Sequence, residues 1–296
     1  MKKTFAIVGC GKIGSAFGTC LAALGHKPLG FASKTLSSAK KAAGKAGCDV
    51  FAKDPVEVTK EADIVFIATP DGVIEDVCAD IANRNGFKKG GAALHCSGAL
   101  PSTILKSANM RQAFTGSIHP LQSFSSDDFS KNPFAGIIVA IEGQEPAARA
   151  AKKIAEDLGA EPITIRTEAK ILYHASAVIA SNYFVTLVDV ASRLVEKAGV
   201  SDRDAIRMLS PLLAGTLGNI KKSGIAKALT GPIARGDVGT VQSHMEELEK
   251  KAPQFLRLYK ELGSHTVDVA KTGKTLSGSA AKKLKYLFSQ SGDRRK

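Results

Sequence analysis

Short apolar runs alternate with amphipathic stretches along the first half of the chain. Runs such as "TFAIV" and "DIVFIA" have the length and composition of buried strands, whereas "IGSAFGTCLAALG" and "GVIEDVCADIANRNG" repeat apolar residues at helical spacing. Strands that alternate with helices in this way are typical of a parallel, doubly wound sheet. The pattern therefore predicts a Rossmann-like α/β fold for this part of the chain.

The strand pattern stops after "EPITI", and everything from Thr167 onward has helical periodicity. The first helix is predicted to run from Thr167 to a stop at Gly199, and Pro211 is expected to kink or break the helix after it. We therefore predict two domains, an α/β dinucleotide-binding domain over 1–166 and an all-helical domain for substrate and dimer contacts over 167–296.

A glycine-rich loop follows the first predicted strand. Gly9, Gly11 and Gly14 form a G-x-G-x-x-G pattern that joins this strand to a helix. The first glycine permits a tight turn, the second lets the backbone approach a pyrophosphate, and the third lets the helix pack on the strand. With Lys12 and Ile13 at the helix start, the loop predicts dinucleotide binding; the alternative is a tight turn without a ligand.

The residues after the second strand favour NADP over NAD. An acidic residue usually holds the ribose hydroxyls at this point, yet none occurs between Gly11 and Asp49. Ser33 and Lys34 stand there instead, and a hydroxyl and an ammonium suit a ribose 2′-phosphate. Lys34 as an ordinary surface residue is the alternative. Three further cofactor contacts are expected at the ends of other strands: Thr69, Pro70 and Ser97.

Candidate catalytic residues occur in a loop and on the long helix. His119 precedes a proline at a strand end, close to Gln122, and is a candidate proton donor or substrate ligand. On the long helix, a polar stripe interrupts the apolar residues. Lys170, His174 and Ser181 are expected on nearly one line, with Asn182 beside it. His174 is the second candidate donor and Asn182 a substrate-orienting group, unless the stripe is a structural polar network.

The stretch "ALTGPIARGD" interrupts the helical half with more polar residues than a turn requires. Thr230 and Arg235 are candidates for binding an anionic substrate, as is Ser181 on the long helix. The alternative for Arg235 is an ion pair with Asp237, which is itself suited to cap the following helix.

Composition narrows the possible partners. The net charge of +13 allows nucleic-acid binding, but the chain has no Trp and only four Tyr, so this possibility ranks last. No apolar run reaches the roughly 20 residues of a membrane span, so no membrane partner is expected. The five cysteines form no C-x-x-C pair, which argues against disulfides and a metal site and favours the cytoplasm. The apolar helical half predicts a homodimer.

Four segments together resemble a known family: "HCSGALPSTIL", "GSIHPLQSF", "ASNYFVTL" and "ALTGPIARGDVGTV". The chain is similar over essentially its whole length to bacterial oxidoreductases that join a Rossmann-like domain to a helical domain of unknown function. Their plan is that of the 6-phosphogluconate dehydrogenase-like enzymes, which include ketopantoate reductase and pyrroline-5-carboxylate reductase. The resemblance implies an NADP-dependent oxidoreductase, with ketopantoate as the leading substrate.

One departure from this pattern concerns the catalytic pair. Ketopantoate reductases carry a helix Lys followed four residues later by Asn, whereas here Lys170 is followed by His174. The expected reaction is reduction of a small 2-oxo acid by NADPH. The alternatives are a reductase of another carbonyl or an imine, and a non-catalytic NADP-binding sensor.

Overall fold

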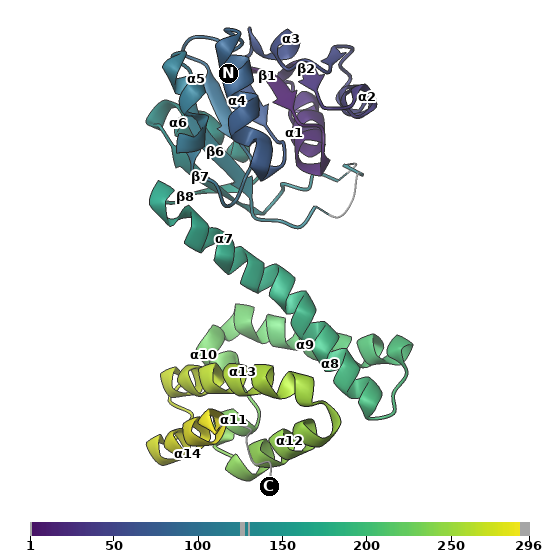
Figure 1. The fold of residues 1–296 in the computed structure, drawn as a ribbon, viewed down its shortest axis with the longest axis vertical. Coiled ribbons are helices and arrows are strands. Elements are labelled where there is room, and N and C mark those ends of the chain that lie inside the picture. Colours follow the sequence, from purple (N-terminus) through teal and green to yellow (C-terminus); the bar gives the residue numbers. More distant parts are fainter. Residues whose placement is uncertain (1, 125–127, 130, 291–296) are drawn as a thin grey trace. The chain divides into compact units, whose positions relative to one another are not determined.

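The computed structural model describes residues 2–124, 128–129 and 131–290, which form two compact units (Figure 1). The first unit comprises residues 1–182 and the second residues 183–296. The first unit therefore contains the sheet and also the first half of the long helix that follows it.

An eight-stranded sheet forms the centre of the first unit. Its strands lie in the order β3-β2-β1-β4-β5-β6-β7-β8. All neighbours are parallel except β6 and β7, so the predicted doubly wound parallel sheet is confirmed and extended by an antiparallel pair. The strands are β1 (Thr4–Val8), β2 (Lys27–Ala32), β3 (Phe51–Ala52), β4 (Ile64–Ile67), β5 (Ala92–His95), β6 (Phe114–Pro120), β7 (Ile138–Gly143) and β8 (Glu161–Thr164).

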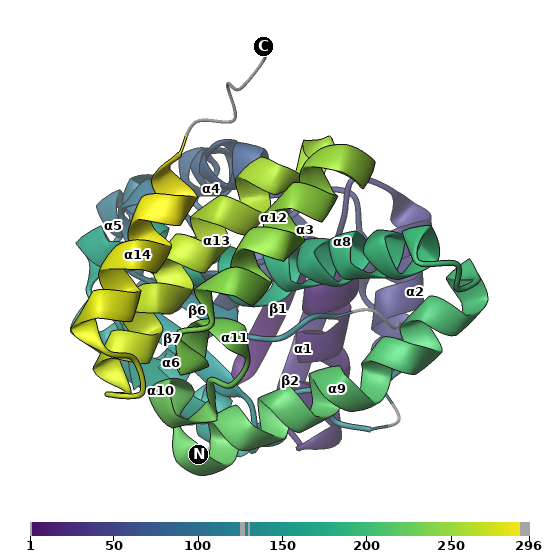
Figure 2. The same ribbon diagram turned by 90° about the horizontal axis from the view of Figure 1, so that it is seen from below.

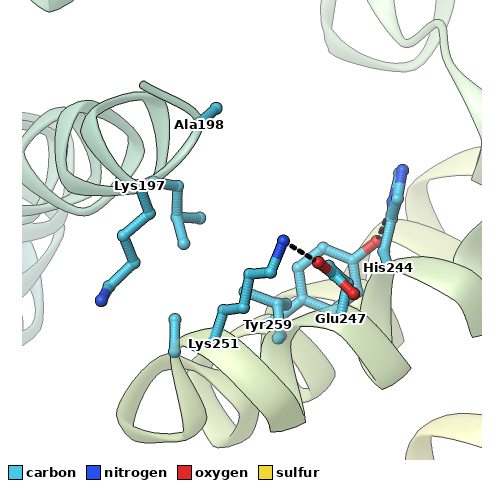
Figure 3. Close-up of a pocket in the computed structure, with 9 residues that line it drawn as sticks. Lys197, Ala198, His244, Glu247, Lys251 and Tyr259 are labelled. Atoms are coloured by element: carbon cyan, nitrogen blue, oxygen red, sulfur yellow. Dashed lines mark hydrogen bonds and ion pairs between the residues drawn. The ribbon is translucent and has the colours of Figure 1, made fainter. Parts of the chain in front are cut away.

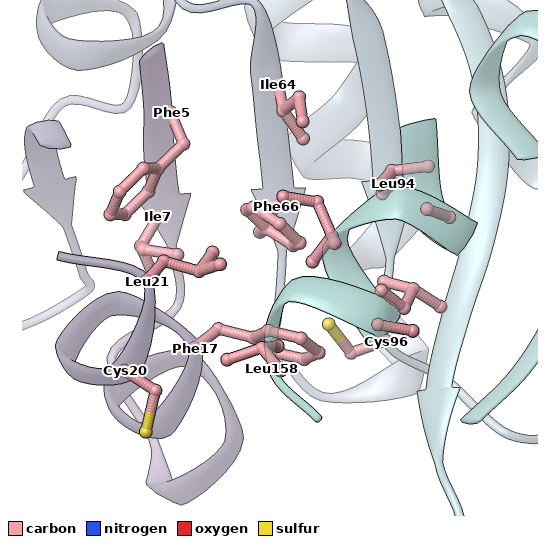
Figure 4. Packing of buried hydrophobic residues seen from close by; sticks show 14 of the residues in the cluster. Phe5, Ile7, Phe17, Cys20, Leu21, Ile64, Phe66, Leu94, Cys96 and Leu158 are labelled. Atoms are coloured by element: carbon pink, nitrogen blue, oxygen red, sulfur yellow. The ribbon is translucent and has the colours of Figure 1, made fainter. Parts of the chain in front are cut away.

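Helices cover both faces of this sheet. Because side chains alternate along a strand, β1 sends Phe5 and Ile7 into one core and Ala6 and Val8 into the other. In the first core, Phe17 of α1 stacks on Phe66 of β4 with ring centroids 5.0 Å apart (Figure 4). The helices of this unit are α1 (Lys12–Ala23), α2 (Leu36–Lys45), α3 (Val56–Thr59), α4 (Ile74–Asn83), α5 (Lys106–Met110) and α6 (Glu145–Asp157), with 3-10 turns η1 (Asp71–Val73), η2 (Ser102–Leu105) and η3 (Thr167–Ala169).

The predicted long helix exists but changes its winding partway. α7 (Lys170–Val178) continues through a π-helical turn, Ile179–Tyr183, into α8 (Phe184–Lys197). Gly199 follows with φ +96°, which confirms the predicted stop. The whole span Thr167–Lys197 is long and apolar enough to cross a membrane by length and composition, although polar residues interrupt its apolar runs. One such helix is weak evidence for a membrane span.

The second unit is helical in its described residues (Figure 2). Its small core contains Val241, Val267, Leu284 and Phe288 from α12, α13 and α14. Pro211 lies inside α9 and does not end it, because the helix continues to Ser223. Besides α8, the helices are α9 (Asp202–Ser223), α10 (Ile225–Ala228), α11 (Pro232–Arg235), α12 (Val238–Lys251), α13 (Pro253–Thr272) and α14 (Gly278–Ser289).

Candidate functional site

The glycine loop has the local geometry that dinucleotide binding requires. Gly9 has φ +100°, and a β-carbon there would lie 2.6 Å from the carbonyl carbon of Ala68. A β-carbon on Gly14 would lie 2.0 Å from the carbonyl oxygen of Gly9, so only glycine lets α1 pack this closely. A β-carbon on Gly11 would have nothing within 4 Å. Gly11 therefore borders open space, where a ligand can approach the backbone at the α1 N-terminus.

This open space is a cavity of about 1030 Å³ at the carboxyl edge of the sheet. Its lining comes from the ends of β1, β2 and β4, the start of α1 and the segment after β6. Such an edge is where open α/β sheets bind their ligands. Of the residues suggested by the sequence, those that line this cavity are Gly9, Gly11, Lys12, Ile13, Ser33, Lys34, Thr69, Pro70 and Gln122.

The surroundings of this cavity are strongly basic. A smaller cavity of about 240 Å³ shares the residues 10–12 with it and lies against α2. The described linings of both cavities contain lysines and no Asp or Glu. The lysines are Lys12, Lys34, Lys41, Lys45 and Lys53. A ligand with several phosphates fits this charge distribution.

Two polar side chains that line the cavity, Thr69 and Cys10, differ in what they can contribute to a ligand. The hydroxyl of Thr69 is buried and has no hydrogen-bond partner in the structure, so it remains available to a ligand in the cavity that Thr69 lines. The Cys10 thiol contacts the carbonyl oxygen of Ala32 at 3.5 Å. Burial raises the pKa of this thiol to about 12, so it is not a nucleophile at neutral pH.

Ser97 shapes the turn after β5 instead of lining the cavity. Its hydroxyl accepts hydrogen bonds from the amides of Ala99 (3.1 Å) and Leu100 (3.0 Å). This tight turn brings Gly98 close to two imidazoles. A β-carbon on Gly98 would lie 2.6 Å from Nδ1 of His174 and 2.7 Å from Nε2 of His119. Both predicted catalytic histidines therefore meet at one backbone position.

His119 and His174 form a cluster with Tyr173. The ring centroids of the two histidines are 6.1 Å apart, and Nδ1 of His119 is 2.9 Å from the hydroxyl of Tyr173. Nδ1 of His174 is buried and has no hydrogen-bond partner among the residues that the structure describes. When Tyr173 donates its proton to Nδ1 of His119, the ring proton lies on Nε2, the nitrogen beside Gly98. The cluster can thus present a proton donor and an unsatisfied imidazole nitrogen.

The pKa values in this cluster favour neutral groups. Burial, the positive charge of Lys170 and then His174 lower the pKa of His119 to about 4. Burial raises the pKa of the Tyr173 hydroxyl to about 12. His119 and Tyr173 are therefore both uncharged at pH 7, which suits proton donation through a hydrogen bond.

A third histidine near this cluster, His95, has a hydrogen bond at only one of its two ring nitrogens. The side chain is fully buried in β5, and its Nδ1 accepts a hydrogen bond from the amide of Ser97 at 3.2 Å. Its Nε2 is buried and neither accepts nor donates a hydrogen bond within the described part of the chain. Burial is the main cause that lowers the pKa of His95 to about 3, and the charges of Lys170 and His119 add to it, against a smaller raising contribution from the backbone of Pro101.

Beneath the histidines lies a buried ion pair that sequence reasoning did not identify. Lys170 and Glu142 are 1% and 2% exposed, and their charged atoms are 3.2 Å apart. Lys170 also donates to the hydroxyl of Ser117. The available signals were an acidic residue inside the apolar strand "GIIVAIEG" and a lysine on an apolar helix. Their pairing depends on a contact between β7 and α7, which sequence periodicity does not predict.

Ser181 and Asn182 lie elsewhere on the long helix. Both are exposed, in the π-helical turn Ile179–Tyr183. The predicted line from Lys170 through His174 to Ser181 assumed 100° per residue throughout, and the extra residue of a π turn changes that phase. The structure therefore joins Lys170 and His174 to the histidine cluster without Ser181 and Asn182.

Thr230 and Arg235 belong to the second unit. Thr230 lines a cavity of about 560 Å³ between α9, α10 and α13. Arg235 is exposed at the end of α11. Asp237 caps α12 by accepting from the amide of Thr240 at 3.0 Å, as expected from the sequence. The alternative for Arg235, an ion pair with Asp237, has little support. Hydrogen bonds with Thr240 are the main cause of the lowered pKa of Asp237, burial opposes them, and the positive charge of Arg235 contributes less.

A fourth cavity, of about 400 Å³, is lined by the end of α8 and by α12 and α13 (Figure 3). Its polar side chains are already engaged with one another. Nδ1 of His244 is 2.9 Å from the hydroxyl of Tyr259, and Lys251 pairs with Glu247. We therefore assign the candidate chemistry to the sheet edge, where polar atoms remain without partners.

Comparison with known proteins agrees with this two-part construction. The sequence matches the family model of a Rossmann-like domain over residues 2–120 and that of a domain of unknown function, DUF2520, over residues 137–266. No curated protein matches the sequence.

Several solved structures share the fold over most of the chain. TM1727 from Thermotoga maritima is 29% identical, with a TM-score of 0.73 over 91% of this chain and 99% of that protein. The candidate NADP oxidoreductase BF3122 from Bacteroides fragilis is 22% identical, with a TM-score of 0.70 over 88% and 96%. A reductive aminase from Aspergillus terreus, in complex with NADPH and ethyl levulinate, is 16% identical, with a TM-score of 0.65 over 97% and 99%. The fold is thus one that NADPH-binding reductases also use.

Proposed function

We propose that this chain, which belongs with the proteins that join a Rossmann-like domain to a DUF2520 domain, is an NADPH-dependent oxidoreductase. The observation that carries this proposal is the cavity at the sheet edge. It combines an open glycine loop, a helix N-terminus, a buried hydroxyl without a partner and a lysine-rich lining. A phosphorylated dinucleotide satisfies all four features.

The residues of this chain fit NADP better than NAD. Gly9, Gly11 and the first amides of α1 would hold the pyrophosphate, and the Thr69 hydroxyl would bond to the cofactor deeper in the cavity. Ser33 and Lys34 follow β2, where the adenosine ribose of a Rossmann ligand lies, and the described residues that line the cavity there include no carboxylate. A carboxylate would repel a 2′-phosphate, whereas the ammonium of Lys34 attracts it.

Bound NADPH supplies a hydride to a carbonyl carbon, and the protein must supply a proton to the carbonyl oxygen. His119 and His174 are the candidate donors. The neutral ring of His119 would donate its Nε2 proton beside Gly98 while its Nδ1 takes the hydroxyl proton of Tyr173, and a proton from solvent would then restore the Tyr173 hydroxyl. The products are NADP⁺ and the corresponding alcohol, so the reduction is balanced by one hydride and one proton.

Within this reaction class we propose a small anionic 2-oxo acid as the substrate, with ketopantoate as the leading choice. In the first unit, Gln122 at the cavity is the proposed polar contact for this acid, with Ser181 and Asn182 as further candidates. In the second unit, Arg235 and Thr230 are the candidates for binding a carboxylate. The family resemblance and the positive charge of the chain support this choice. An imine is the second candidate, because a reductive aminase shares the fold.

We also propose that a second copy of the chain covers the apolar face of the long helix and of α9. Of the 23 large hydrophobic residues exposed among the described residues, twelve lie between Ile171 and Ile220. Such a concentration marks an interaction surface. All five cysteines are free thiols, which supports a reducing, cytoplasmic setting. Neither a membrane nor nucleic acid is proposed as a partner.

The test is a titration of the purified protein with NADPH and NADH, followed by NADPH oxidation with ketopantoate, other 2-oxo acids and cyclic imines. We expect NADPH to bind at least about tenfold more tightly than NADH, corresponding to ~1.4 kcal/mol from the 2′-phosphate contacts. The variant Lys34→Ala should remove most of this preference. Lys60→Ala is the matched control, because it removes the same charge from an exposed residue outside the cavity lining.

The two steps of this test separate the alternatives. Tight NADPH binding with oxidation at background for every substrate would favour the NADP sensor over the enzyme. Equal affinity for NADH and NADPH would contradict the role of Ser33 and Lys34. Turnover of an imine but of no 2-oxo acid would replace the substrate class and leave the cofactor site standing.

A further inference from the structure

The buried pair of Glu142 and Lys170 has no place yet in the proposed reaction. Ser117 and Glu142 face each other in the register of β6 and β7, and Lys170 reaches both from the first turn of α7. A charge that is almost completely buried is stable only with a partner and with hydrogen bonds for its remaining polar atoms. The contacts of Glu142 show how completely this requirement is met.

Glu142 accepts four hydrogen bonds from three residues in two segments. Its Oε1 accepts from the amide of Ser102 at 2.8 Å and from Lys170 at 3.2 Å. Its Oε2 accepts from the hydroxyls of Ser102 at 2.7 Å and Thr167 at 2.9 Å. Ser102 begins η2, and Thr167 and Lys170 lie in the first turns of the long helix. One carboxylate thus ties the helix start to the sheet and to the loop after β5.

The buried pair of Glu142 and Lys170, with its hydrogen bonds, is called the anchor below. The helical geometry connects the anchor to the histidine cluster. Tyr173 and His174 follow Lys170 by three and four residues, so all three share one face of α7. The anchor therefore fixes the rotation of α7 about its axis and its position along that axis, and with them the positions of Tyr173 and His174. On the sheet side, Ser117 lies two residues before His119 on β6, so the same anchor also contacts the strand that carries the other imidazole.

We propose that Glu142 and Lys170 are positioning residues that hold Tyr173 and His174 against His119 beside Gly98. Lys170 is not a proton donor in this assignment, because its ammonium is 1% exposed and is already bonded to Glu142 and Ser117. The role in the reaction rests on the proposed function, whereas the arrangement of the cluster can be measured without turnover.

The anchor also places a fixed positive charge under the cluster. The groups that act on His119 are Tyr173 and His174 from α7, Lys170 from the anchor and His95 from β5. Burial is the largest cause of the low pKa of His119, and Lys170 is the second. Removing the ammonium should therefore raise the pKa of His119 partway toward its ordinary value, and this shift reports on the anchor directly.

The experiment is an NMR titration of the histidine ring protons in the full-length chain, for wild type, Lys170→Met and Thr167→Val. In Lys170→Met we expect the His119 midpoint to rise by about one pH unit. Thr167→Val removes one hydrogen bond to Glu142 and leaves the ion pair, so it should fold. We expect it to change the chemical shifts of His174 and Tyr173 with a smaller change of the His119 midpoint. The exposed pair Lys106–Glu75, broken by Glu75→Gln, is the matched control and should change neither.

Function gives a second readout. With any substrate that is turned over, Thr167→Val should lower kcat by about tenfold or more and leave the Kd of NADPH within about twofold, because the anchor lies outside the cofactor cavity. An unchanged His119 midpoint in folded Lys170→Met, or unchanged His174 and Tyr173 shifts in Thr167→Val, would overturn the positioning role. If these spectral changes occur in a protein without turnover, the anchor stands and the proposed enzymatic function fails.

Discussion

Gly98 is the residue on which the geometry of the candidate site depends most directly. Its backbone does not adopt a positive φ, so alanine is tolerated there by the chain itself. The added methyl group would nevertheless lie 2.6 Å from His174 and 2.7 Å from His119 and would force the two rings apart. We expect Gly98→Ala to lower kcat by about 100-fold and to leave NADPH affinity nearly unchanged, as measured by steady-state kinetics and fluorescence titration.

Gly44→Ala is the control for this substitution. Gly44 lies in α2, and a β-carbon there would meet nothing within 4 Å. It should leave kcat unchanged and raise stability slightly, since alanine is the better helix former. Full activity of Gly98→Ala would mean that the reaction does not use the space between the two histidines.

The buried histidines predict a pH dependence of stability. The pKa values of His119 and His95 are about 4 and about 3 in the folded chain, below the ordinary value of 6.5. At a pH between the folded pKa and the ordinary pKa of a histidine, the unfolded state binds more protons than the folded state. The free energy of unfolding therefore falls as pH decreases from about 6.5 toward 4. We expect up to ~1.4 kcal/mol per pH unit for each histidine, measured by urea unfolding at a series of pH values.

Variants assign this loss to individual residues. His119→Gln and His95→Gln should each lower by about one the number of protons taken up on unfolding, which reduces the slope of the free energy of unfolding with pH. His265→Gln, at an exposed residue, should not. An equally steep loss in a folded His119→Gln, His95→Gln double variant would show that other groups cause it.

Single residues were predictable where the local sequence alone determines their role. The three glycines of the loop follow a spacing with a known backbone purpose, and the structure shows the contacts of Gly9 and Gly14 that exclude side chains. Tyr173 and Glu142 were missed because each acquires its partner from another element. No periodicity in the sequence indicates that a strand carboxylate will meet a helix ammonium.

At the scale of elements, the alternation of strands and helices was predictable, and the details that depend on pairing were not. The strand run "GIIVAIEG" was identified, but its antiparallel direction depends on the chain between β6 and β7 containing no crossover helix in its described residues. The π turn was missed for a similar reason. Helical periodicity assumes a constant 100° per residue, and a local change of winding leaves no signal in composition.

Pro211 gives a prediction at this scale. Because it lies inside α9, it removes one amide donor and places its ring against the preceding turn. Pro211→Ala should raise the stability of the second unit by about 1–3 kcal/mol, measured by thermal unfolding followed by circular dichroism. Lys221→Ala on the same helix should change it by less than about 0.5 kcal/mol. A loss of stability in Pro211→Ala would show that the ring makes favourable contacts outside the helix.

For the whole molecule, the change from alternating strands and helices to helices alone predicted two domains divided at residue 166, whereas the structure divides into units after Asn182; the number of copies stays a prediction. The exposed apolar residues of the long helix include Leu172 and Val185, which are 76% and 67% exposed. We expect sedimentation velocity to show a dimer at micromolar concentration. Leu172→Asp and Val185→Asp should weaken the dimer by at least about tenfold, because each would bury a charge without a partner.

Met110→Asp is the control for the dimer test. Met110 is 80% exposed at the end of α5, so it belongs neither to the long helix nor to α9. It should leave the sedimentation coefficient unchanged. A wild-type chain that sediments as a monomer throughout would contradict the proposed second copy, and association only with lipid vesicles would assign the apolar helix to a membrane.

The lysine-rich rim of the cofactor cavity has a kinetic consequence. A concave surface that carries charge of one sign accelerates the encounter with ligands of the opposite sign, and dissolved salt weakens this attraction over about 8–10 Å. NADPH should therefore associate more slowly as ionic strength rises, whereas its dissociation rate should change little. The fraction of the protein that carries cofactor would then follow the ionic composition of its surroundings, and other polyphosphates would compete for the same entrance.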